Sequence, residues 1–302
     1  MKILVTGATG QLAHCLVEEA RETVEIVALG RPQCDITEYS SVVAILASTR
    51  PDVVVNAAAY TAVDKAESEP DAAHLVNAFG AGNVARACAA AGTPLIHIST
   101  DYVFDGTGRG YYTEGDPTGP MGVYGRTKLA GEQAVMAHAP RSVVLRTAWV
   151  HSPFGNNFVK TMLRLAASRP EISVVADQHG SPTYAPHLAR TVVAVAHRLH
   201  EGCASEATPS GIYHCAGDGE ATWCELAREA FRVSSSRGGV SANVKAITTA
   251  EYPTPARRPA NSRLDISRLR RDFGVDMPHW TVGVNECVIR LVTASDGAQA
   301  AR

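Results

Sequence analysis

The chain begins with a short apolar segment that runs directly into a glycine turn and a helix. A strand is predicted over residues 2–6, and the turn follows as Gly7-Ala8-Thr9-Gly10, with a small residue, Ala13, three positions later. Glycines at this spacing let backbone N–H groups at the start of a helix approach a pyrophosphate, and the small third position lets helix and strand pack closely. A tight turn without a ligand gives the same pattern. The segment therefore predicts the start of an alternating α/β fold and only suggests a dinucleotide site.

Four more apolar segments alternate with helical segments over the first half of the chain. Further strands are expected at residues 25–29, 52–59, 95–99 and 142–149. The run at 52–59 is continuously apolar, as is typical of a parallel sheet covered on both faces. The predicted fold class is α/β, with a Rossmann-type doubly wound parallel sheet in an NAD(P)-binding domain over residues 1–150. A smaller C-terminal α/β lobe over residues 151–302 is expected to bind the substrate and can return strands or helices to the first domain.

Polar side chains follow the fourth strand and recur at the start of the next helix. The strand delivers Ser99, Thr100 and Asp101, and the helix carries Tyr124 and Lys128, which are four residues apart and lie on one face. An ammonium group favours a neighbouring phenolate, so Lys128 is expected to lower the pKa of Tyr124 from its ordinary value of about 10. The Thr100 hydroxyl could hold a carbonyl oxygen beside the phenol. We predict Thr100, Tyr124 and Lys128 to be catalytic. The alternative is that Tyr124 and Lys128 are ordinary solvent-exposed side chains on one face of a helix.

The end of the second strand bears on the choice of cofactor. An acid there usually bonds the ribose hydroxyls of NAD, but this strand ends in Leu29-Gly30-Arg31. A guanidinium can bind a 2′-phosphate, so NADPH is expected to serve at least as well as NADH; a solvated Arg31 is the alternative. Asp35 either accepts from the adenine amino group or caps the helix expected at 37–49. Asn77 either supports the site through backbone bonds or lies on the surface.

Composition limits the class of function. The 302 residues are 45% hydrophobic and 19% charged, with a formal net charge of -2, so neither a nucleic-acid nor a membrane partner is expected. The apolar N-terminal run is too short for a signal peptide or a membrane span, which favours the cytoplasm. Seven scattered cysteines without a C-x-x-C pair predict reduced, structural thiols.

Two loops complete the predicted site. Residues 105–121, rich in Gly, Pro, Asp and Thr, are expected to form a flexible flap. The Pro-rich, basic stretch 252–262 contains Arg257, Arg258 and Asn261, which could grip a diphosphate because guanidinium forks match phosphate oxygens. A basic surface loop is the alternative.

Together these motifs resemble the extended short-chain dehydrogenases/reductases and, more narrowly, the dTDP-4-dehydrorhamnose reductase family. The matching runs lie at residues 62–67, 99–106, 124–132, 156–158, 177–183 and 258–262. The resemblance implies that NAD(P)H reduces the 4-keto group of dTDP-4-dehydro-L-rhamnose to give dTDP-L-rhamnose, a precursor of cell-surface polysaccharide. Another nucleotide-sugar 4-ketoreductase, giving a talose-type product, and a non-catalytic subunit like the methionine adenosyltransferase β subunit are the alternatives. A related dehydratase usually has Glu where Tyr102 stands.

The motifs and the resemblance together give the predicted binding residues. Those for the cofactor are Gly7, Gly10, Gln11, Leu12, Arg31, Asp35, Ile36, Ala59, Tyr60, Thr61, Ile98, Tyr124 and Lys128. Those for the nucleotide-sugar substrate are Thr100, Asp101, Trp149, Asn157, Arg257, Arg258 and Asn261. Some members bind Mg²⁺ at a dimer contact through glutamates, but His14-Cys15 stand in that part of the first helix, so no metal is predicted. A homodimer is left open, as are the product stereochemistry and the nucleotide.

Overall fold

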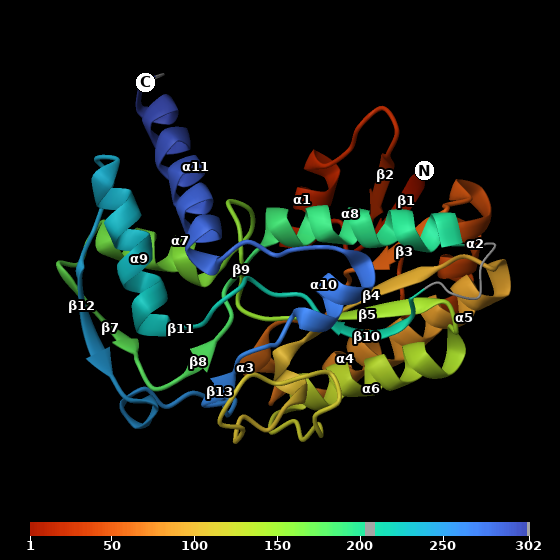
Figure 1. The fold of residues 1–302 in the computed structure, drawn as a ribbon, viewed down its shortest axis with the longest axis horizontal. Helices are drawn as coiled ribbons and strands as arrows, with labels where there is room; N and C mark the ends of the chain where they lie inside the picture. The colour runs from red at the N-terminus through yellow and green to blue at the C-terminus, as the bar shows by residue number, and fades with distance from the viewer. Residues whose placement is uncertain (203–208, 301–302) are drawn as a thin grey trace.

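The computed structural model describes residues 1–202 and 209–300, with side chains described to residue 294. Its centre is a six-stranded parallel sheet in the order β10-β5-β4-β3-β1-β2 (Figure 1). The strands are β1 (Lys2–Thr6), β2 (Glu25–Leu29), β3 (Val53–Asn56), β4 (Leu95–Thr100), β5 (Ser142–Thr147) and β10 (Gly211–His214). The predicted doubly wound α/β class is confirmed. The sixth strand comes from the second half of the chain, so the sheet does not end near residue 150.

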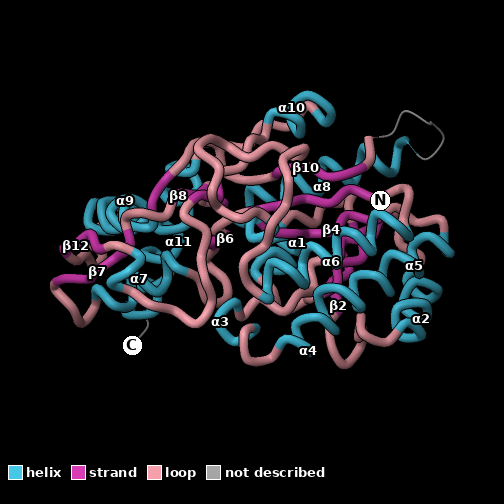
Figure 2. Tube along the Cα trace, turned by 90° about the horizontal axis from the view of Figure 1, so that it is seen from below, coloured by secondary structure: helices cyan, strands magenta, loops and turns pink. Residues whose placement is uncertain are grey.

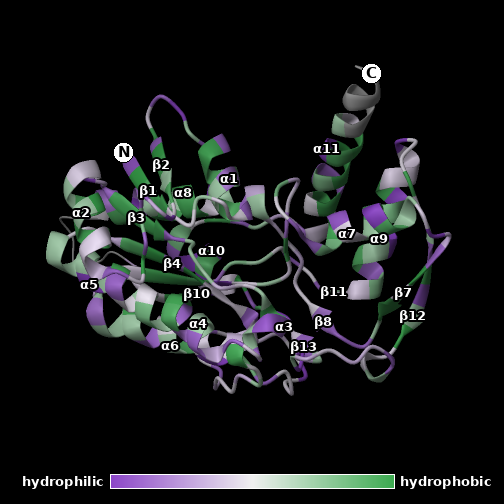
Figure 3. Ribbon diagram, turned by 180° about the vertical axis from the view of Figure 1, so that it is seen from behind, coloured by the Kyte–Doolittle hydropathy of each residue, from purple (hydrophilic) through white to green (hydrophobic). Residues whose placement is uncertain are grey.

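Helices cover both faces of this sheet. On one face lie α1 (Gln11–Glu18) and α8 (Ala185–Glu201), and on the other α2 (Tyr39–Thr49), α5 (Ala81–Ala91) and α6 (Val123–His138) (Figure 1). Successive side chains of a strand point to opposite faces of the sheet. Ile3 and Val5 therefore pack with α1 and α8, whereas Leu4 packs with α2 and α5. Figure 3 shows these hydrophobic strands between helices whose outer faces are polar.

Two helices between β3 and β4 are joined by a wider turn. They are α4 (Pro70–His74) and α5, and the turn between them is the π-helical η1 (Leu75–Gly80). Helix α6 crosses η1 at Gly131, where an added Cβ would lie 2.1 Å from the carbonyl oxygen of Asn77. This close approach requires glycine, and it brings the π turn against the helix that carries Tyr124 and Lys128. A π turn of this kind is frequent at functional sites.

A smaller α/β lobe lies beside the sheet, as Figures 1 and 2 show. In it, α7 (Phe158–Ala166) and α9 (Trp223–Ser236) pack on the parallel pair β7 (Glu171–Val175) and β12 (Asn243–Ile247), and α11 (Trp280–Ala300) packs on α9. The short strands β8 (His179–Gly180), β11 (Ala221–Thr222) and β13 (Asn261–Ser262) form a three-stranded sheet. The remaining elements are α3 (Val63–Ala66), η2 (Asp101–Val103), β6 (Val150–His151), β9 (Thr183–Tyr184), η4 (Thr249–Glu251) and α10 (Ser267–Phe273).

Among the residues that the structure describes, no helix combines the length and apolar character needed to cross a membrane. In the same part of the chain, His, Cys, Asp and Glu side chains do not gather into a metal-binding group of three or more. The six described cysteines are buried free thiols, and burial raises the pKa of Cys88 to about 12. Cys203 lies outside the described residues.

Candidate active site

The glycine turn lies at the carboxyl end of β1, between the sheet and the first helix. Gly7 has a φ of +80°, and an added Cβ would lie 2.7 Å from the Cα of Ala58. Gly10 is the N-cap of α1, so the N–H groups of Gln11 and Leu12, in the first helical turn, have no acceptor within the helix. A side chain at Gly7 would collide with the backbone that follows β3, so only glycine allows this tight turn. The free N–H groups that the turn presents are the donors that bind a pyrophosphate. The residues present therefore fit a dinucleotide.

The segment after β2 holds the residues expected near the adenosine. Arg31 is exposed, and Asp35 accepts hydrogen bonds from the Thr37 backbone N–H at 2.9 Å and from its hydroxyl at 2.8 Å. These bonds lower the pKa of Asp35, with a smaller contribution from Arg31. Helix α2 begins only at Tyr39, so Asp35 caps the preceding turn and not the helix. Ile36 is buried.

A buried amide holds in place the segment Ala59-Tyr60-Thr61, which was expected to line the cofactor site and is called the trough segment below. Asn77 accepts from the Tyr60 N–H at 2.8 Å and donates to the Tyr60 carbonyl at 3.1 Å and to the Thr127 hydroxyl at 3.1 Å. Asn77 is thus buried and not on the surface, and it ties this segment to α6 through the π turn. Of the two readings of Asn77, the supporting role is the one that the structure favours.

Thr100, Asp101 and Tyr124 meet where β4 ends. The Thr100 hydroxyl donates to Asp101 Oδ1 at 2.9 Å, and Thr100 is also hydrogen-bonded to the Tyr124 phenol. Burial raises the pKa of Tyr124 to about 12, while the Thr100 bond acts in the opposite direction. Burial also raises the pKa of Asp101 to about 6, opposed by hydrogen bonds from Ser262 and Thr100. The Thr100 hydroxyl, the Tyr124 phenol and the Asp101 carboxyl therefore lie close together.

Lys128 lies one turn from Tyr124 but is directed at the strand. Its ammonium donates to the Ile98 carbonyl at 2.7 Å and lies 3.5 Å from His97 Nε2. Burial lowers the pKa of Lys128 to about 8, and the nearby Glu132 carboxylate opposes this. The expected lowering of the Tyr124 pKa by Lys128 is not found in this structure, where burial, Thr100 and Asp101 determine it. The reason is that Lys128 Nζ is held against the β4 backbone.

A cavity of about 860 Å³ opens between the sheet domain and the lobe. Asn157 and Arg258, both expected to bind substrate, line it, together with Thr61 from the trough segment and Tyr102. Tyr102 packs edge-on against Tyr124, with ring centroids 5.6 Å apart, so the ring of Tyr102 lies between the cavity and Tyr124. It is large enough for a nucleotide sugar.

The remaining predicted substrate residues lie around this cavity. Trp149 stacks on Trp223 with ring centroids 3.5 Å apart, so it backs the cavity wall that Trp223 forms. Arg257 is exposed and, with Asn261, lines an adjoining groove that shares Arg258 with the cavity. Arg258 itself forms a 2.8 Å ion pair with Asp64 of α3.

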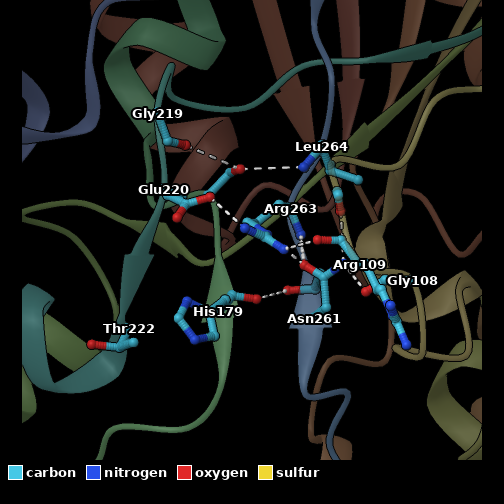
Figure 4. Close-up of polar contacts among 12 residues, drawn as sticks. Gly108, Arg109, His179, Gly219, Glu220, Thr222, Asn261, Arg263 and Leu264 are labelled. Atoms are coloured by element: carbon cyan, nitrogen blue, oxygen red, sulfur yellow. Dashed lines mark hydrogen bonds and ion pairs between the residues drawn. The ribbon is translucent and has the colours of Figure 1, made fainter.

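Asn261 bonds to the loop that was expected to be a flexible flap. Its amide nitrogen donates to the carbonyls of Gly108 and Gly110, each at 2.8 Å, and its oxygen accepts from Arg263 (Figure 4). Arg263 also donates to the Arg109 carbonyl at 2.8 Å and pairs with Glu220 at 2.6 Å. Residues 108–110 are therefore fastened to the lobe by two side chains, a restraint that loop composition did not indicate.

Sequence reasoning missed two sets of supporting residues. Ser152 donates to Gln11 Oε1 at 2.8 Å, so it helps to orient the side chain at the start of α1. Thr6, Asn56 and His97 form a buried polar line across the sheet that reaches Lys128. The signal for this line was available, since Asn56 and His97 are polar residues inside otherwise apolar strands.

Comparison with known proteins places this geometry in one family. Residues 1–293 match the family model described as "RmlD substrate binding domain". The dTDP-4-dehydrorhamnose reductase of Sinorhizobium fredii is 49% identical over 294 residues, which cover 97% of each chain. The crystal structure of a Clostridium acetobutylicum dTDP-4-dehydrorhamnose reductase has a TM-score of 0.89 at 38% identity, covering 96% of this chain and 99% of the other. The Bacillus anthracis enzyme, solved in complex with NADP, has a TM-score of 0.88 at 38% identity and the same coverage.

Proposed function

Because the chain belongs to the RmlD substrate-binding family of dTDP-4-dehydrorhamnose reductases, we propose that it reduces the 4-keto group of dTDP-4-dehydro-L-rhamnose with NAD(P)H to give dTDP-L-rhamnose. It is thus an oxidoreductase of nucleotide-sugar biosynthesis. The observation that carries the proposal is the contact of Tyr102 with Tyr124, which places the substrate-sized cavity next to the phenol and the Thr100 hydroxyl, with one tyrosine ring between them.

The site residues have distinct roles in this reaction. The nicotinamide cofactor, when bound, supplies the hydride. Tyr124 gives its phenolic proton to the sugar oxygen as the carbonyl becomes an alcohol. Thr100 donates a hydrogen bond to the same oxygen, and one such donor stabilises a transition state by about 2.7–4 kcal/mol. Lys128 binds the ribose side of the cofactor.

The other predicted residues are assigned either to the cofactor or to the substrate. Gly7, Gly10, Gln11 and Leu12 hold the pyrophosphate, since they form the glycine turn and the first positions of α1. Asp35 and Ile36, in the segment after β2, are assigned to the adenine. Arg31 favours the 2′-phosphate of NADPH because the end of β2 carries no carboxylate. Asn157, Arg257, Arg258 and Asn261 are proposed to face the nucleotide diphosphate. Reaction in the cytoplasm and a homodimer remain predictions.

The proposal is tested by adding the enzymatically prepared ketosugar to the protein with NADPH. We expect NADPH oxidation and an NMR spectrum of the product that matches dTDP-L-rhamnose; a talose-type spectrum would favour the alternative reductase. Tyr124→Phe should still bind NADPH but lose turnover by about 10²–10⁴-fold. Tyr213→Phe is the matched control, because Tyr213 lies on the edge strand β10 and its phenol bonds Asp272 of α10. Near-full activity of Tyr124→Phe would exclude the assigned role.

A further inference from the structure

A line of buried polar side chains crosses three strands and ends at the lysine of the site. Thr6, Asn56 and His97 are register partners on the neighbouring strands β1, β3 and β4. Thr6 Oγ1 lies 2.6 Å from Asn56 Oδ1, Asn56 Nδ2 lies 3.1 Å from His97 Nδ1, and His97 Nε2 lies 3.5 Å from Lys128 Nζ. All four residues are at most 2% exposed. Buried polar groups at this depth are costly unless their donors and acceptors match.

The direction of each hydrogen bond follows from the first one. The Thr6 hydroxyl oxygen accepts from the Ala58 N–H at 3.4 Å, so its hydrogen is available to Asn56 Oδ1. With its oxygen engaged as an acceptor, Asn56 offers its NH₂ group to His97, and His97 Nδ1 must accept. A neutral imidazole carries its hydrogen on the other nitrogen. The ring is neutral because burial and Lys128 hold the pKa of His97 well below its ordinary value. His97 therefore presents Nε2–H to Lys128.

This arrangement bears on the charge of Lys128. An N–H aimed at Nζ opposes an ammonium, whose own hydrogens point outward, and favours a neutral amine, whose lone pair can accept. The other groups around Nζ act in the opposite direction: the Ile98 carbonyl accepts from it at 2.7 Å, and Glu132 lies one turn away on α6. Glu132 is itself paired with the buried Arg146 at 2.7 Å, which limits its effect. The pKa of Lys128, about 8, lies in the range where such a contact changes the charge.

We propose that His97 is a positioning residue for the reductase reaction, held by Thr6 and Asn56 in the tautomer that aims Nε2–H at Lys128, so that Lys128 switches between ammonium and amine near neutral pH. The proposal deepens the proposed function because it assigns Lys128 a titrating role beside Tyr124. A purely structural buried histidine would leave the titration of Lys128 unchanged.

The tautomer can be observed directly. Protein labelled with ¹⁵N-histidine should show His97, assigned by its loss in His97→Leu, with hydrogen on Nε2 and a lone pair on Nδ1. A hydrogen on Nδ1 would overturn the inference. The measurement needs no substrate, so it decides the question even if the ketosugar is not turned over, which would be a failure of the proposed function alone.

The consequence for Lys128 is tested by reversing the tautomer. In Asn56→Asp a carboxylate accepts from both Thr6 and His97, which moves the histidine hydrogen to Nδ1 and turns the Nε2 lone pair toward Lys128. The titration midpoint of Lys128, followed by NMR of ¹³Cε-labelled lysine and assigned with Lys128→Arg, should rise by about one pH unit or more. The basic limb of kcat/KM should move with it.

Two variants show whether the rise in the Lys128 midpoint comes from the His97 tautomer, from the added carboxylate charge or from a general change in core packing. In His97→Leu/Asn56→Asp the carboxylate is present without the imidazole, and most of the rise should disappear; an undiminished rise would assign it to the carboxylate charge and overturn the proposal. His214→Gln removes another buried histidine, on β10, which bonds the Asp265 carbonyl, and it should leave the Lys128 midpoint in place. An unchanged midpoint in Asn56→Asp would equally overturn the proposal.

Discussion

Asn157 Nδ2 donates a hydrogen bond of 2.9 Å to Gln11 Oε1, across a sequence separation of 146 residues. Gln11 opens α1 beside the glycine turn, and Asn157 both lines the cavity and caps α7 by accepting from the Lys160 N–H at 3.1 Å. One hydrogen bond therefore joins the proposed pyrophosphate site to the proposed substrate wall, so the two ligands should affect one another's binding.

A double-mutant cycle on Gln11→Ala and Asn157→Ala measures this link. Each variant should weaken NADPH binding and raise the ketosugar KM. The effect of the double variant should differ from the sum of the two single effects by about 0.5–1.5 kcal/mol, the usual contribution of one hydrogen bond. Asn157→Asp is the control for the α7 cap, because it keeps the acceptor for Lys160. Additive losses would show that the sites are independent.

The two neighbouring arginines of the 252–262 loop should differ in importance. Arg258 lines the cavity, whereas Arg257 is exposed and faces only the adjoining groove. Arg258→Ala should raise the ketosugar KM about tenfold or more with little change in kcat, since a charged hydrogen bond to a phosphate contributes about 1.5–3 kcal/mol. Arg257→Ala, its matched control, should change KM by less. Equal effects would contradict the assignment of the diphosphate to Arg258.

Cofactor choice should depend on Arg31. Its exposed guanidinium follows β2, and there is no carboxylate at the strand end to repel a 2′-phosphate. Arg31→Ala should raise the KM for NADPH by roughly fivefold to tenfold and leave that for NADH unchanged, because a solvent-screened contact to one phosphate contributes about 1 kcal/mol. Arg21→Ala, an exposed arginine in the turn before β2, serves as control. A parallel loss with both cofactors would disprove the 2′-phosphate contact.

Asp101 should make the fold less stable at neutral pH than in acid. Its pKa of about 6 lies above the ordinary value of 3.8, so the folded chain binds this proton more tightly than the unfolded chain does. Its contribution to stability is therefore full below the lower value and is lost as the pH rises through the higher one. Relative to wild type, Asp101→Asn should gain on the order of 2–3 kcal/mol of unfolding free energy between about pH 4 and about pH 7.5.

Urea unfolding at several pH values measures this difference. Asp105→Asn provides a control of opposite sign, because hydrogen bonds from Thr107 lower the pKa of Asp105 and stabilise its charged form. A difference between Asp101→Asn and wild type that does not vary with pH would contradict the buried, protonated carboxyl.

The sequence predicted the parts of the site that depend on local pattern. Strand-to-glycine spacing located Gly7 and Gly10, and helical spacing placed Tyr124 and Lys128 on one face. It could not predict where Lys128 Nζ points, because that depends on the Ile98 carbonyl and His97, which belong to another element. For the same reason it missed the bonds of Asn261 to the 108–110 loop, which join segments about 150 residues apart. The π turn at Leu75–Gly80 packs closely against Gly131, and this tertiary contact has no signature in the local sequence pattern.

The position of β10 at the edge of the main sheet has a consequence for synthesis on the ribosome. When β5 has emerged, its outer edge has no partner, since Gly211–His214 is translated more than sixty residues later. An open strand edge is prone to pair with other chains until its own strand arrives. The nascent chain therefore has to extend through α7, β7 and α8 before β10 can complete the main sheet. A fragment ending near residue 150 should be a poor folding unit.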